Sequence, residues 1–168
     1  MPKPLALKSS TFHRPDRNVI RRAKSARLDS PPKNGKPLLL WIDDYKPGLE
    51  LYKSMFESRG FRVLTADSGT EGLQLAAKNM IDVAVTDYEM VDMDGGAVAN
   101  GLKLLEPSVP VVIFSGSLDI PDRVKSRVDR VCDKAGPRDQ LFQAVRQVMA
   151  EKRMTQPASK RFCRRVQE

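Results

Sequence analysis

Polar side chains follow four of the short apolar runs in this sequence, and their types suit metal binding and group transfer. They are Asp43, Asp44, Asp87, Ser115 and Lys134. Taken singly, an Asp at the end of such a run is more often a helix cap or a turn former. Three carboxylates brought together, however, repel one another and need a cation among them, and an all-oxygen ligand set favours Mg²⁺ or Mn²⁺ over zinc. The pattern therefore predicts an acidic metal site with a hydroxyl and an ammonium group beside it.

This combination of side chains fits phosphoryl transfer to a carboxylate. A carboxylate is a poor nucleophile toward a group that already carries negative charge, so a metal ion is needed to neutralise charge in the transition state. The ammonium group of Lys134 offers a movable positive charge for the phosphoryl oxygens, and the hydroxyl of Ser115 can donate a hydrogen bond to them. Each residue type thus has a role in such a reaction.

The elements that position these residues alternate between short apolar runs and amphipathic segments, which indicates successive βα units and a parallel sheet. Strands are predicted at 38–42, 61–66, 81–86, 111–114 and 128–132. Helices are predicted at about 46–59, from Ser68, across Val98–Leu105, at 121–127 and from Pro137. This (βα)5 pattern predicts an α/β fold with a doubly wound, parallel, five-stranded sheet. Since ligands bind at the carboxyl ends of such strands, the polar groups are expected to meet there.

The charge of the chain is divided unevenly. The 168 residues have a net charge of +8, but residues 37–150 carry thirteen Lys and Arg against seventeen Asp and Glu. Residues 1–36 carry ten basic side chains against two acidic ones, and residues 151–168 carry six against two. We therefore predict one acidic domain at 37–150 between a disordered basic N-terminal arm at 1–36 and a basic C-terminal tail at 151–168. Nucleic acid could bind only through these arms.

The remaining composition excludes several classes of protein. Cys132 and Cys163 lie far apart and have no metal-binding or disulfide spacing, which favours a reduced, cytoplasmic protein. No apolar run is long enough to span a bilayer, so membrane insertion is not expected. An aspartyl phosphatase of the haloacid dehalogenase type would carry Asp-x-Asp after its first strand, where this chain has adjacent Asp43 and Asp44.

In identity, order and spacing, these residues resemble the receiver domain of bacterial response regulators. The matching residues are the pair Asp43-Asp44, Asp87 within Asp-Tyr-Glu-Met-Val-Asp-Met-Asp-Gly, the pair Ser115-Gly116, and Lys134. The resemblance covers about Leu38 to Met149. It implies a flavodoxin-like fold with strand order 2-1-3-4-5. Because 168 residues leave no room for a second catalytic domain, we expect a stand-alone receiver without an output domain.

The resemblance also implies a role for each site residue. Asp87 would be the phosphoacceptor, with Ser115 and Lys134 contacting the phosphoryl oxygens. Mg²⁺, or alternatively Mn²⁺, would be held by Asp44 and Asp87, by Asp43 through water, and by the backbone carbonyl of Glu89. The phosphoryl group would come from a sensor histidine kinase or a phosphotransfer protein, and the signal would pass to an unidentified downstream protein. Such a protein is not an enzyme beyond catalysing its own phosphorylation and dephosphorylation.

Three positions depart from the receiver pattern. Val91 stands where the family usually has proline, which changes the stiffness of the loop after Asp87. Ala135 replaces a proline that forms a cis bond after the lysine, and a trans bond is expected here because a cis bond without proline costs about 2.5–4 kcal/mol. Val131 replaces the aromatic residue that reports phosphorylation. The chemistry is thus expected to be intact and the readout altered.

Two other functions remain as alternatives. A pseudo-receiver would keep the fold as a protein-binding scaffold without being phosphorylated, and a nucleic-acid-binding protein would act through the basic arms. Because all five site residues are present, phosphorelay signalling is the favoured interpretation.

Overall fold

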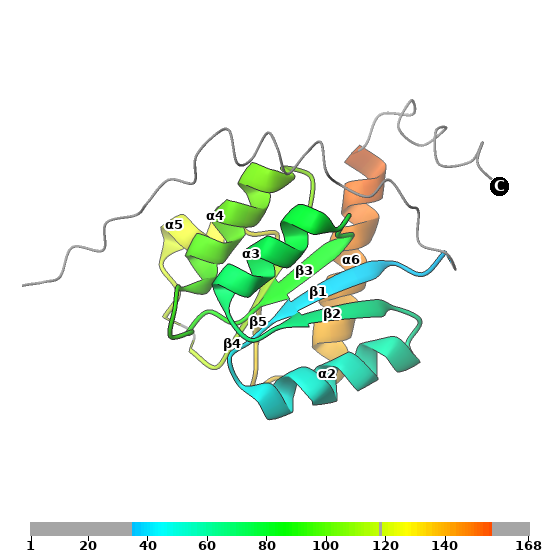
Figure 1. The fold of residues 1–168 in the computed structure, drawn as a ribbon, viewed down its shortest axis with the longest axis horizontal. Coiled ribbons are helices and arrows are strands. Elements are labelled where there is room, and N and C mark those ends of the chain that lie inside the picture. Colours follow the sequence, from blue (N-terminus) through cyan, green and yellow to red (C-terminus); the bar gives the residue numbers. More distant parts are fainter. Residues whose placement is uncertain (1–34, 118, 156–168) are drawn as a thin grey trace, which may run out of the picture.

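The computed structural model describes residues 35–117 and 119–155 and has five parallel strands in one sheet, in the order β2-β1-β3-β4-β5. The strands are β1 (Leu38–Ile42), β2 (Arg62–Ala66), β3 (Val83–Thr86), β4 (Val111–Ser115) and β5 (Arg130–Asp133). The helices are α2 (Lys46–Ser58), α3 (Gly69–Lys78), α4 (Gly95–Leu105), α5 (Asp122–Lys125) and α6 (Arg138–Thr155). Helices α3 and α4 cover one face of the sheet, and α2 and α6 cover the other (Figure 1). The predicted fold class and strand order are confirmed.

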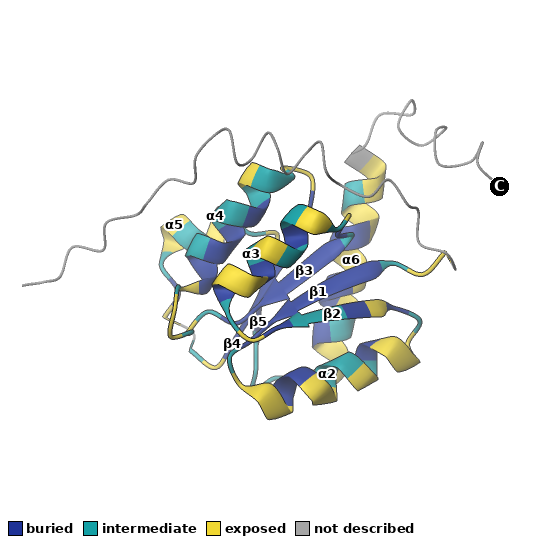
Figure 2. Cartoon of the chain, viewed as in Figure 1, coloured by how far each residue is buried: buried dark blue, intermediate teal, exposed yellow. Residues whose placement is uncertain are grey.

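The core has two apolar layers, one on each face of the sheet. The layer under α2 and α6 is rich in aromatic rings, with Trp41 stacked on Tyr52 and packed edge-on against Phe114. The layer under α3 and α4 is aliphatic and includes Ile42 and Val98. Every residue of β1, β3 and β4 is buried (Figure 2). These strands read as continuous apolar runs because helices cover both of their faces.

Several predicted boundaries were wrong. Strand β3 begins at Val83 rather than at residue 81, since Asp82 bonds to the N–H of Leu38 through its carboxylate (2.9 Å). Strand β5 begins at Arg130 rather than at residue 128, because the carboxylate of Asp129 accepts the N–H of Val111 (2.8 Å). The fifth apolar run is thus shorter than its sequence suggested.

The structure tests the predicted domain boundaries only in part. Helix α6 continues to Thr155, past the expected boundary at residue 150. Residues 1–34 and 156–168 lie outside the described residues, so the disorder of the basic arms stays a prediction. Among the described residues, no helix is both long and apolar enough to cross a membrane.

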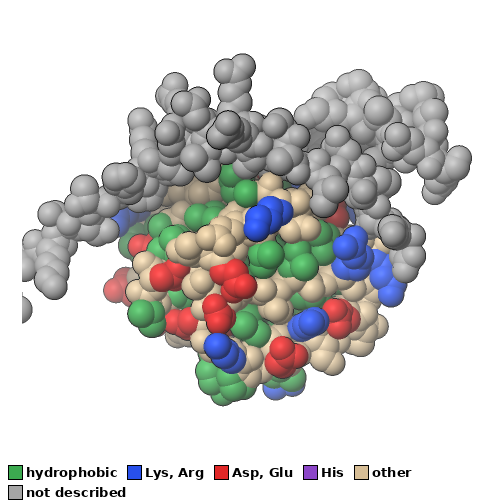
Figure 3. Space-filling view, viewed as in Figure 1, with side chains coloured by type: hydrophobic (Ala, Val, Ile, Leu, Met, Phe, Trp, Pro, Cys, Tyr) green, Lys and Arg blue, Asp and Glu red, His purple; other side chains and the backbone are tan. Residues whose placement is uncertain are grey.

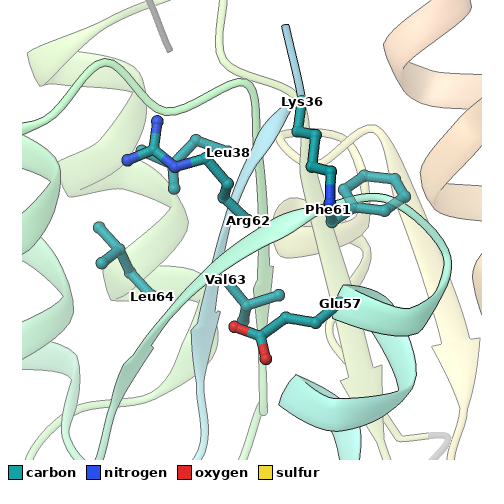
Figure 4. A pocket seen from close by; sticks show the side chains of 7 residues that line it. All are labelled: Lys36, Leu38, Glu57, Phe61, Arg62, Val63 and Leu64. Carbon is teal, nitrogen blue, oxygen red and sulfur yellow. The ribbon is translucent and has the colours of Figure 1, made fainter. Parts of the chain in front are cut away.

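A hollow of about 440 Å³ lies at the amino ends of β1 and β2. The side chains that line this hollow lie on both faces of β2, with Leu64 on one side and Val63 and Glu57 on the other (Figure 4). It is at the opposite end of the strands from Asp43. Ligands of open parallel sheets bind at the carboxyl ends, so this hollow is not the candidate site.

Candidate functional site

The strand register brings Asp43 and Asp87 side by side. Ile42 of β1 pairs with Thr86 of β3, so the residues that follow them leave the sheet at the same level. The N–H of Asp87 donates to the carbonyl of Ile42 (2.8 Å), which continues this pairing past the last strand residue. Carboxylate oxygens of Asp43, Asp44 and Asp87 lie within 4.8 Å of one another. The structure thus gathers the three acidic residues that the sequence singled out.

Backbone N–H groups hold all three carboxylates. Asp43 is 2% exposed and accepts from the N–H of Tyr45 (3.0 Å), and Asp87 is 8% exposed and accepts from the N–H of Tyr88 (2.7 Å). Half-buried Asp44 accepts from the N–H of Val91 (3.2 Å). Buried charges require such partners. Acidic side chains gather at the lower left of the space-filling view, toward the carboxyl ends of the strands (Figure 3).

Lys134 joins two of these carboxylates. Its Nζ lies 2.9 Å from Oδ2 of Asp43 and 2.9 Å from Oδ2 of Asp87. Burial alone would lower the pKa of Lys134, but the hydrogen bonds to Asp87 and Asp43 and the charges of both carboxylates outweigh it, so the pKa lies above its ordinary value. The backbone also fixes this residue, because its N–H donates to the carbonyl of Ser115 (2.8 Å).

The site fits a hard divalent cation. Three carboxylates face one ammonium group, so the cluster keeps an excess of negative charge, and all of its donor atoms are oxygens. Asp43, Asp44 and Asp87 would hold the ion. A bound Mg²⁺ would supply the positive charge that Lys134 alone cannot provide.

The other predicted site residues stand close by, and their roles stay predictions. Ser115 is 1% exposed at the end of β4, and its Oγ accepts from the N–H of Ser117 (3.0 Å). Glu89 is exposed in the loop after β3. The bond between Lys134 and Ala135 is trans, as expected from the missing proline, and the described residues contain no cis peptide.

Two supporting residues were not anticipated from the sequence. Thr86 is fully buried, and its Oγ1 donates to the carbonyl of Asp87 (2.9 Å). Gly95 begins α4 and donates its N–H to the carbonyl of Tyr88 (2.9 Å). A Cβ on Gly95 would strike the carbonyl of Asp87 and lie 2.9 Å from Cα of Tyr88. In the sequence, the signal for this close approach was the glycine that directly follows Asp94, the residue that caps α4.

A Gly95→Ala substitution should therefore disturb the site. The added methyl group meets backbone rather than a flexible side chain, so Asp87 must shift, and we expect a loss of about 1–3 kcal/mol in the free energy of unfolding. Gly116→Ala is a matched control, because a Cβ there has nothing within 4 Å. Urea denaturation of both variants measures the difference. Equal stability of the two variants would contradict the close approach of α4 to Asp87.

A flavodoxin-like sheet with an acidic cluster and a lysine at its carboxyl edge is the arrangement expected of a receiver domain, and comparisons with known proteins agree. The family model of the response regulator receiver domain matches residues 39–146. The chain therefore belongs to the response regulator receiver family.

Individual relatives are similar over the same region. The chain is 33% identical over 114 residues to the transcriptional regulatory protein GlrR of Escherichia coli. The aligned region covers 66% of this chain and 26% of GlrR. The chain is 33% identical over 88 residues to the cell cycle transcriptional regulator CtrA of Caulobacter vibrioides, covering 52% of this chain and 38% of CtrA. The chain thus spans well under half the length of these curated relatives.

Solved receiver structures superpose on most of the described residues. A response regulator receiver domain protein from Clostridium thermocellum has a TM-score of 0.66 and 29% identity, covering 71% of this chain and 99% of the other. The response regulator TrrA of Thermotoga maritima, solved in complex with Mg²⁺-BeF, has a TM-score of 0.64 and 22% identity, covering 67% of this chain and 98% of the other. At that identity, the second comparison supports the fold alone.

Proposed function

We propose that this chain accepts a phosphoryl group on Asp87 from a sensor histidine kinase or a phosphotransfer protein, in a reaction that depends on Mg²⁺. The observation that carries the proposal is the position of Lys134, whose Nζ bridges the buried carboxylates of Asp43 and Asp87 at 2.9 Å each. An ammonium group and a cluster of carboxylates at the end of a parallel sheet are the groups that phosphoryl transfer to an aspartate requires.

Each side chain of the site has its own role in the proposed transfer. A carboxylate oxygen of Asp87 forms a bond to phosphorus while the bond from phosphorus to the donor nitrogen breaks, and the electron pair of that bond returns to the donor imidazole, which then takes up a proton. Lys134 turns from the carboxylates toward the phosphoryl oxygens, and Ser115 donates its hydroxyl to them. Asp43, Asp44, Asp87 and the carbonyl of Glu89 would hold Mg²⁺, which would neutralise charge on the phosphoryl oxygens.

The output of the proposed reaction is a contact with another protein. Curated relatives such as GlrR and CtrA are transcriptional regulators, but this chain covers only 26% and 38% of them. We propose a downstream protein that recognises the phosphorylated receiver as the partner, and the basic arms as a second route, to nucleic acid.

Incubation of the protein with acetyl phosphate and Mg²⁺ tests the proposal. Intact mass spectrometry should show the addition of one phosphoryl group, and EDTA should prevent it. A protein that stays unmodified while it binds Mg²⁺ would contradict phosphoryl transfer and favour the scaffold function of a pseudo-receiver.

A further inference from the structure

The side chain of Asp92 ties the loop after Asp87 to a neighbouring helix. Its Oδ1 accepts from the N–H of Gly69 (3.1 Å), and its Oδ2 accepts from the N–H (2.8 Å) and the hydroxyl (3.0 Å) of Thr70. Helix α3 also has a cap of its own, because Oγ of Ser68 accepts the N–H of Glu71 (3.3 Å). Asp92 therefore satisfies two further N–H groups of the first turn from a different βα unit.

The loop and the helix are fitted closely at this point. A Cβ on Gly69 would strike Cγ of Met93 and lie 2.7 Å from Cγ2 of Val98, so a larger residue at this position would force these side chains to shift. Partial burial alone would raise the pKa of Asp92, but the hydrogen bonds from Thr70 and Gly69 outweigh it and lower the pKa below its ordinary value. The carboxylate is therefore ionised in its contact with α3 at neutral pH.

The residue before Asp92 contacts the acidic site. The N–H of Val91 donates to Oδ2 of Asp44 (3.2 Å). The side chain of Val91 is 96% exposed, so packing of that side chain does not hold this part of the loop. Proline, which the receiver pattern usually has at this position, could not donate the bond. The position of the Val91 N–H thus depends on how the residues before and after Val91 are held, and Asp92 is one of these residues.

We propose that Asp92 is a positioning residue for the metal site: by fixing the loop on α3, it holds the N–H of Val91 against Asp44 and thereby orients the Asp44 carboxylate. This inference rests on the proposed binding of Mg²⁺ at Asp44. The interaction does not require Asp92 to touch the ion, and it gives this chain a support for Asp44 that a proline at position 91 would exclude.

Three variants separate positioning from general stability. Asp92→Ala removes every bond to α3, Asp92→Asn keeps an acceptor oxygen but removes the charge, and Ser68→Ala removes a cap of the same helix without touching the loop. Two measurements are made on each: hydrogen exchange of the Val91 amide without metal, and the Mg²⁺ dissociation constant from calorimetry.

Asp92→Ala should expose the Val91 amide to exchange and raise the Mg²⁺ dissociation constant roughly tenfold, which is the effect expected for the loss of a ligand's supporting contact. Asp92→Asn should stay within about threefold of the parent protein, and Ser68→Ala should change neither measurement although it destabilises α3. Equal weakening by Ser68→Ala, or an unchanged Val91 amide in Asp92→Ala, would overturn the proposal. A parent protein that binds no Mg²⁺ would overturn the proposed function itself, and this inference with it.

Discussion

An Asp87→Asn protein should keep its unmodified mass after incubation with acetyl phosphate and Mg²⁺. The amide has the size of the carboxylate and can still accept the N–H of Tyr88, which the native Oδ1 accepts at 2.7 Å. Its oxygen is too weak a nucleophile to form the acyl phosphate bond. Because Lys134 retains its bond to Asp43, the variant should remain folded, and the loss of modification should be complete.

The matched control for this variant is Asp94→Asn. Asp94 lies in the same loop, but its Oδ1 accepts the N–H of Ala97 (2.8 Å) at the start of α4. Asn caps a helix about as well as Asp, so this protein should fold and be modified like the parent. A phosphoryl mass increase in Asp87→Asn would assign the acceptor to another residue and remove the basis of the proposed function.

The placement of the acidic residues could be predicted from the sequence because it depends on strand ends. The runs 38–42 and 111–114 are apolar throughout, since helices cover both faces of β1 and β4, and such runs are easily located. Parallel strands that end together bring the following residues to one edge, and the pairing of β1 with β3 then makes Asp43 and Asp87 neighbours. The order of the strands came from the resemblance to receivers, since local patterns do not contain it.

The details that escaped prediction arise from contacts between distant parts of the chain. Asp92 caps α3 across more than twenty residues of sequence, and Asp82 bonds Leu38 across 44 residues. In a sequence, each of these acids is indistinguishable from an ordinary turn residue. The start of β5 was misplaced for the same reason, because Asp129 turns its carboxylate back to Val111. The sequence thus located the candidate ligands better than the residues that support them.

Replacement of Lys134 by Met should separate the binding of metal from the transfer reaction. Lys134 lies between two buried carboxylates, and its Nζ lies 5.9 Å from the ring centroid of Phe114, which packs against Trp41. Without its charge, the three carboxylates repel one another with no cation nearby, so the metal-free protein should lose about 3 kcal/mol in the free energy of unfolding. Mg²⁺ should then bind at least about tenfold more tightly, because it no longer competes with the ammonium group. The rate of modification by acetyl phosphate should nevertheless fall roughly a hundredfold, since Lys134 no longer contacts the phosphoryl oxygens.

Lys103→Met is the matched control, because Lys103 forms an ion pair with Asp129 (2.8 Å) away from the acidic cluster. Loss of this ion pair should lower the free energy of unfolding by at most about 1 kcal/mol and should not alter Mg²⁺ binding. Urea denaturation with and without Mg²⁺ measures the stability of both variants, and Trp41, the single tryptophan of the chain, provides the fluorescence signal. Tighter Mg²⁺ binding together with slower phosphorylation can arise only if Lys134 opposes the metal in the resting site and assists the phosphoryl group in the reaction. If Lys134→Met binds Mg²⁺ no more tightly than the parent, the ammonium group and the ion do not share the site, and the assignment of Asp43 and Asp87 as metal ligands is wrong.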